Sequence, residues 1–119
     1  VAWDLVRYVS EFLISYAKLG LLDYMNVVDS AMLGLKIAEK YTKPAIHLLE
    51  SFGEAAKLLK HNKNYDEDKD LQLVYSEIIQ RIRQVGHTGS RRDPEQMWST
   101  AKSVLMALNE PEFAERPKT

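Results

Sequence analysis

The chain has 119 residues, of which 45% are hydrophobic and 28% are charged, so its length and composition suit one globular domain rather than a disordered segment. It contains no cysteine, which excludes disulfides, thiolate nucleophiles and cysteine-bound zinc. Its net charge of -1 is too small for bulk electrostatics to indicate nucleic-acid or membrane binding, so any such function would have to depend on local clusters of charge.

The first predicted helix covers residues 2–19 and is apolar over most of its circumference. Its polar side chains form one narrow stripe at helical spacing, made of Asp4, Arg7, Glu11, Ser15 and Lys18. A surface helix usually buries about a third of its circumference, so the wider apolar coverage predicts either a central helix or a subunit interface. The aromatic residues expected in such an interface are Trp3, Tyr8, Phe12 and Tyr16. The charged stripe argues against a membrane span or a signal peptide, and Gly20 is expected to end the helix in a left-handed cap.

Two further helices are predicted over residues 23–41 and 44–61. The earlier one repeats apolar residues at alternating spacings of four and three, which suits antiparallel packing, and small residues such as Gly34 would let a neighbour approach closely. Pro44 separates the two helices, because proline is favoured in a first helical turn and disfavours helix at the residue before it.

Acidic residues and histidines supply the candidates for a metal site. Four carboxylates stand at positions 1, 3, 5 and 12 of a calcium-binding loop pattern, namely Asp66, Asp68, Asp70 and Glu77. Leu71, however, occupies the position where that loop needs glycine, which favours an ordinary acidic first turn of a helix over residues 70–85. His47 and His61 each lack a second histidine three or four residues away. We therefore expect surface histidines, no metal and no cofactor.

The last predicted helix runs from Pro94 to Leu108 after a loop over residues 86–92. Gly86 is expected to end the preceding helix. Asp93 is expected to cap the last helix, with Gln96 as its capping-box partner three residues on.

No segment alternates apolar and polar residues as a strand would, and no internal repeat occurs. The sequence therefore predicts an all-α fold, a single-domain bundle of about five helices in an up-and-down arrangement over residues 1–109. Residues 110–119 are expected to form a frayed C-terminal tail.

Basic side chains gather near the end of the fourth predicted helix and in the loop after it. Arg81, Arg83 and His87 precede Arg91 and Arg92, and Lys102 follows one helix later. Guanidinium groups beside a helix N-terminus bind phosphate well, and a histidine there can act as general acid or base in RNA cleavage. Arg91, Arg92 and Lys102 are the residues expected to bind an anion or nucleic acid.

The segment from Arg81 to His87 resembles the HEPN superfamily, and within it the HepT-type toxins. These domains carry an arginine, four to six intervening residues and a histidine, and Ser51–Ala56 is similar to a Gly-Glu-Ala segment of their preceding helix. The resemblance covers the C-terminal half of the chain. It implies an all-helical homodimer that cleaves RNA without metal or binds nucleotides, with Arg81 or Arg83 as phosphate clamp and His87 as acid or base. The chain departs from the family at Ile82, where a polar residue is usual, and lacks the tyrosine often found after the histidine.

Two functional hypotheses follow from these patterns. The preferred one is a non-enzymatic interaction module that self-associates or docks a protein partner through the apolar first helix and the arginine-rich corner. The alternative is a HEPN-like RNA-cleaving or nucleotide-binding domain that uses Arg81, Arg83 and His87, so RNA or a phosphate-bearing ligand is a second expected partner. The lack of cysteine and of any recognisable signal or membrane segment leads us to expect an intracellular protein, cytoplasmic or nuclear.

Overall fold

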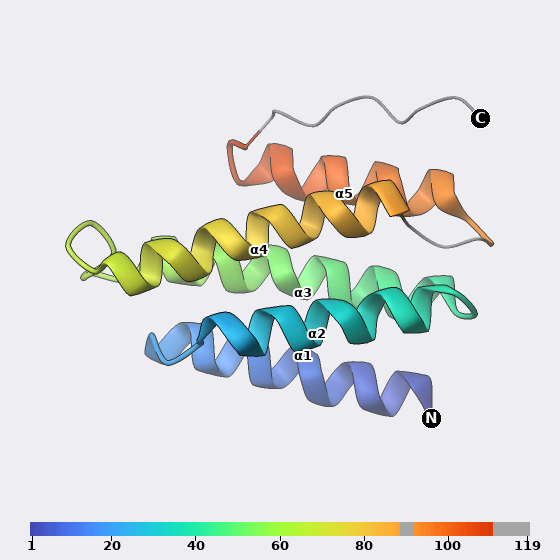
Figure 1. The fold of residues 1–119 in the computed structure, drawn as a ribbon, viewed down its shortest axis with the longest axis horizontal. Coiled ribbons are helices and arrows are strands. Elements are labelled where there is room, and N and C mark those ends of the chain that lie inside the picture. Colours follow the sequence, from blue (N-terminus) through green and yellow to red (C-terminus); the bar gives the residue numbers. More distant parts are fainter. Residues whose placement is uncertain (89–91, 111–119) are drawn as a thin grey trace.

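The computed structural model describes residues 1–88 and 92–110, and these residues form five α-helices. The helices are α1 (Ala2–Leu19), α2 (Tyr24–Ala38), α3 (Thr42–Lys60), α4 (Lys69–Thr88) and α5 (Pro94–Ala107). Consecutive helices run in opposite directions (Figure 1). The predicted all-α, up-and-down, five-helix bundle is confirmed.

The centre of the bundle is α3, which contacts each of the other four helices. Its buried side carries large apolar residues that are almost inaccessible to solvent, Leu48, Leu49, Phe52 and Leu59. By contrast α1 packs mainly against α3 and barely touches α2, and it lies at the edge of the bundle (Figure 1). Of the two alternatives predicted for the first helix, a central position is therefore wrong.

Local hydrogen bonds explain where several helices begin and end. Gly20 has φ 69°, in the left-handed region, and its N–H donates to the carbonyl of Ala17, which confirms the predicted cap of α1. The carboxylate of Asp23 accepts the N–H of Asn26 at 2.8 Å and begins α2. Asp93 begins α5 in the same way, since its carboxylate accepts the N–H of Gln96, as predicted.

The fourth helix is longer than predicted, because it continues through Gly86 to Thr88. A glycine inside a helix costs about 1 kcal/mol relative to alanine. Ile82 and Val85, both in the turn before Gly86, are buried, and the Thr88 hydroxyl donates to the Gln84 carbonyl at 2.7 Å. Packing and this hydrogen bond offset the cost of the glycine, so the predictions that Gly86 ends α4 and that a loop begins there are wrong.

Two glycines allow helices to approach closely. A Cβ atom on Gly53 of α3 would lie 2.5 Å from Cγ1 of Val104 on α5. A Cβ atom on Gly34 of α2 would lie 3.0 Å from Cδ2 of Leu48 on α3, which agrees with the close approach predicted there. None of the helices that the structure describes combines the length and the apolar composition that crossing a membrane requires.

Candidate interaction surface

One side of α1 carries apolar side chains that the bundle leaves uncovered. The helix buries Val6, Ser10, Leu13 and Ala17. Next to this buried face lies what we call the α1 row: Leu5, Tyr8, Phe12, Tyr16 and Leu19. Four of its members are exposed, with relative accessibilities of 41% for Leu5, 71% for Tyr8, 40% for Tyr16 and 67% for Leu19. At 3.6 residues per turn the five positions fall within about 80° of the helix circumference, so they share one face.

Aromatic contact organises the middle of the α1 row. The rings of Phe12 and Tyr16 lie 4.3 Å apart between centroids, at an interplanar angle of 35°. Phe12 also packs against the core and is only partly exposed. The two rings therefore form one packed aromatic surface, and Tyr8 is exposed one turn before it.

Trp3, the fourth predicted interface residue, lies on the other side of α1. Its ring meets the ring of His47 on α3 edge to face, with 5.8 Å between centroids. The guanidinium carbon of Arg7 lies 5.5 Å from the centroid of the same ring. The structure thus groups Tyr8, Phe12 and Tyr16 and separates Trp3 from them.

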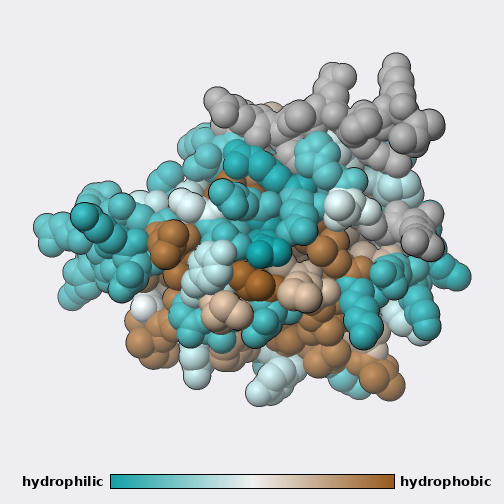
Figure 2. Space-filling view, in the orientation of Figure 1, coloured by the Kyte–Doolittle hydropathy of each residue, from teal (hydrophilic) through white to brown (hydrophobic). Residues whose placement is uncertain are grey.

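Apolar surface continues beyond the α1 row. Brown, apolar surface gathers along the lower part of Figure 2, over α1 and α2, whereas the loop before α4 is teal. Leu21 in the turn after α1, and Met25 and Met32 on α2, are each more than half exposed. If side chains of this size expose on the order of 200 Å² when fully accessible, the α1 row exposes roughly 400 Å². With these three residues the total approaches the area of about 800 Å² that each partner contributes to a standard protein interface.

Helix α4 places Arg81, Arg83 and His87 on more than one of its sides. The Nε atom of Arg81 donates to the carboxylate of Glu77 at 2.8 Å, and its Nη1 atom donates to the Gln84 side chain at 2.9 Å. The Glu77 side chain is only 9% exposed and that of Arg81 is 21% exposed. The Arg81 guanidinium is therefore engaged along its own helix.

Arg83 and His87 stand four residues apart on α4 and share one face of it. Arg81 is rotated by about 120° from His87 around the same helix. His87 is exposed and helical, because α4 continues past Gly86, and does not lie in the loop where it was predicted. The structure therefore brings Arg83 and His87 together, and Arg81 stands on a different side.

The remaining residues predicted to bind anions are dispersed. Arg91 lies outside the residues that the structure describes, and Arg92 is exposed just before α5. Lys102 lies more than two turns into α5, with its Nζ atom 5.0 Å from the ring centroid of Trp98. The N-terminus of α5 is already capped by the carboxylate of Asp93, which supplies negative charge where an anion would bind.

The acidic candidates for a metal site do not gather in the described residues. The side chain of Asp68 accepts the N–H groups of Asp70 and Leu71 at the start of α4, which is the helix-turn alternative predicted for this segment. Glu77 is engaged with Arg81. Within residues 1–88 and 92–110 no three His, Cys, Asp or Glu side chains are placed to hold an ion together.

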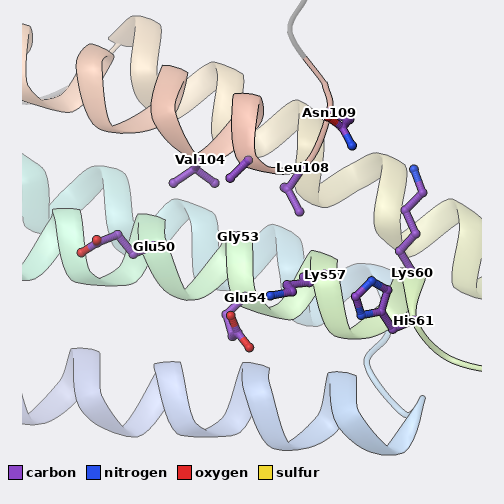
Figure 3. A pocket seen from close by; sticks show the side chains of 10 residues that line it. Glu50, Gly53, Glu54, Lys57, Lys60, His61, Val104, Leu108 and Asn109 are labelled. Carbon is purple, nitrogen blue, oxygen red and sulfur yellow. The ribbon is translucent and has the colours of Figure 1, made fainter.

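A groove of about 580 Å³ lies between α3 and α5. Figure 3 shows Glu50 at one end of it and Lys60 and His61 at the other. Its walls carry both signs of charge, Glu54 and Lys57 included, so it presents no field of one sign to a charged ligand. No spacing signal in the sequence distinguishes these residues from an ordinary exposed helix face.

A hydrogen bond joins the end of α5 to α4. The Tyr75 hydroxyl donates to the Glu110 carboxylate at 3.0 Å, and the Glu110 N–H donates to the Leu105 carbonyl at 2.8 Å. Burial, and then this carboxylate, raise the pKa of Tyr75 above its ordinary value. Glu110, predicted as the first residue of a frayed tail, is thus held in place, while residues 111–119 lie outside the described part of the chain.

Comparison of the chain with protein-family models, with curated proteins and with solved structures gives no match. The geometry described above is therefore the basis for the functional proposals below. The HEPN resemblance stays a sequence-based prediction.

Proposed function

We propose that this chain is a protein interaction module that binds its partner through the α1 row. The observation that carries the proposal is the single face on which Leu5, Tyr8, Tyr16 and Leu19 remain exposed after the bundle has packed. Removing apolar surface from water is worth roughly 25 cal/mol per Å², so a partner chain that covers this face has a substantial driving force.

The residue types of the α1 row and the packing of α1 against the core both suit binding. Tyrosine is enriched among the residues that dominate interface energetics, because its ring supplies area at low entropic cost while its hydroxyl can remain hydrated. Val6, Leu13 and Ala17 anchor the adjoining face of α1 in the core. A row on an anchored helix needs little ordering when it binds, which reduces the entropic cost of association.

Site-specific photo-crosslinking tests this proposal. A photoreactive phenylalanine analogue is placed at Tyr8 in one variant and at Met106 of α5, another exposed apolar residue, in a matched control. Illumination of cells that make each full chain should give a discrete protein adduct from position 8 and none from position 106. Equal adduct formation from both positions, or none from position 8, would refute the proposal.

A second candidate function is RNA cleavage, and the observation that favours it is the one-turn spacing of Arg83 and His87 on α4. In this proposal His87 transfers protons and Arg83 contacts phosphate, because a guanidinium makes paired hydrogen bonds to phosphate oxygens. Wild type should cleave single-stranded RNA without added metal, and His87→Ala and Arg83→Ala should each lose that activity. Cleavage that persists in His87→Ala, or that is absent from the wild type, rules the candidate out.

A further inference from the structure

We infer that the partner of the α1 row is a second copy of this chain, bound antiparallel across a twofold axis that passes beside Phe12. This inference rests on the proposed function and names the occupant of the same surface.

The α1 row reads the same from either end. Its residues are Leu, Tyr, Phe, Tyr and Leu, and the steps between them are three, four, four and three positions. A twofold interface requires that residue i contacts residue j while j contacts i. In an antiparallel pair centred on Phe12, Leu5 faces Leu19 of the second copy, Tyr8 faces Tyr16, and Phe12 faces its own equivalent. A parallel pair or an unrelated partner makes no use of this symmetry.

The exposures of the row are complementary under this pairing. Tyr8, which is 71% exposed, faces Tyr16, which is 40% exposed, and Leu19, which is 67% exposed, faces Leu5, which is 41% exposed. Each pair therefore joins one prominent side chain to one recessed side chain. The less exposed Tyr16 packs against the Phe12 ring, and the two rings together offer Tyr8 of the second copy an aromatic surface. From Leu5 to Leu19 the row is about 21 Å long at 1.5 Å per residue, so contact extends along the whole helix.

The antiparallel orientation brings one pair of opposite charges beside the row together. Asp4 lies near the N-terminal end of α1 and Lys18 near its C-terminal end, and both are exposed. In the pair centred on Phe12, Asp4 of one copy is offset from Lys18 of the other by two residues, about 3 Å along the axis. A parallel pair would leave Asp4 of one copy about 21 Å along the axis from Lys18 of the other. The antiparallel pair also opposes the two helix dipoles.

Engineered cysteines test the pairing directly, because the native chain contains none. The full chain is prepared as Leu5→Cys, as Leu19→Cys and as Met106→Cys, three exposed positions, and folding of each is checked by circular dichroism. A disulfide needs Cα atoms within about 7 Å. Positions 5 and 19 of opposite copies meet this condition, whereas position 5 of one copy lies about 21 Å along the axis from position 5 of the other.

Under mild oxidation, a mixture of Leu5→Cys and Leu19→Cys should form an interchain disulfide between the two variants, and each variant alone should remain largely reduced. Leu5→Cys mixed with Met106→Cys supplies the level expected from random collision. Self-linking of Leu5→Cys as efficient as the mixture, or mixed linking no greater than that control, overturns the inference. A photo-crosslink from position 8 to a different protein, together with no 5-to-19 disulfide, overturns the inference and leaves the proposed function standing. Loss of both signals overturns both.

Discussion

Replacing Arg81 with alanine removes the partner of a carboxylate that has little contact with water. The Glu77 side chain is 9% exposed and receives the Arg81 Nε–H at 2.8 Å. Breaking a fully buried ion pair costs about 3 to 5 kcal/mol, because the remaining charge is left without compensation. The Arg81 side chain is 21% exposed, so water can partly replace the guanidinium. We therefore expect Arg81→Ala to lower the free energy of unfolding by about 2 to 3 kcal/mol.

A double-mutant cycle separates this electrostatic effect from lost packing. In a Glu77→Gln background no buried carboxylate remains, so Arg81→Ala should cost about 1 kcal/mol, which gives a coupling of about 1 to 2 kcal/mol. The matched control is Arg7→Ala, since Arg7 meets Asp4 at 3.8 Å with side chains 64% and 86% exposed. Exposed pairs contribute little, and the contact of Arg7 with the exposed Trp3 ring adds little more, so this variant should change stability by less than about 1 kcal/mol.

Urea unfolding followed by circular dichroism at one fixed protein concentration measures each variant. With an m-value of about 1 to 3 kcal/mol/M for a domain of this size, the Arg81→Ala midpoint should fall by about 1 to 2 M. If Arg81→Ala shifts the midpoint no more than Arg7→Ala, the pairing with Glu77 is not structural. The Arg81 guanidinium would then be available to a ligand, as the HEPN resemblance implies.

Two further predictions concern the contacts that hold α5. Gly53→Ala should destabilise the bundle by about 1 to 3 kcal/mol, because the new methyl would lie 2.5 Å from Val104. In a Val104→Ala background the same substitution should cost less. Equal losses in both backgrounds, measured by thermal unfolding, would contradict this close approach. Tyr75→Phe should cost about 1 kcal/mol at neutral pH, because it removes the hydrogen bond to Glu110. The pKa of Tyr75 is raised in the folded state, so the stability that Tyr75 contributes is full below the ordinary tyrosine pKa of 10.0 and is lost as pH rises from there toward the folded pKa. The stability gap between wild type and Tyr75→Phe should therefore be constant up to neutral and mildly basic pH and shrink above pH 10.0. A gap that stays constant above that pH in urea titrations would refute this.

Local signals were sufficient to predict the helices and several of their ends. Gly20 and Asp93 were predicted correctly because a left-handed cap and a side-chain N-cap depend on neighbouring backbone groups alone. Gly86 was predicted wrongly, because its helical conformation depends on the burial of Ile82 and Val85 against other helices. Sequence periodicity does not reveal how firmly such a turn is packed.

The interaction surface was predictable only in part. Residues 2–19 are apolar over more of the helix circumference than one bundle covers, which indicated that part of the apolar surface would stay exposed. The width of the apolar surface alone did not show which side that would be. Trp3 was grouped with Tyr8 on residue type, although five positions place the two residues about 140° apart around the helix. The contact of Trp3 with His47 on α3 agrees with this separation.

The engagement of Arg81 has a visible signal in the sequence. Glu77 precedes Arg81 by four residues, the spacing at which opposite charges meet on one helix face. Attention to the spacing between Arg81 and His87 led to the prediction of a shared site. The phase of α4 instead places His87 with Arg83.

If a second copy of the chain covers the α1 row, as we infer, the thermal unfolding of the wild type should depend on protein concentration. A dimer that unfolds to separate chains gains stability by mass action, so the wild-type Tm should rise by about 5 °C over a hundredfold increase in protein concentration. Tyr8→Glu puts a charge on the most exposed member of the row, and its Tm should not change with concentration. A wild-type Tm that is independent of concentration, or one that rises equally in Tyr8→Glu, would contradict the claim.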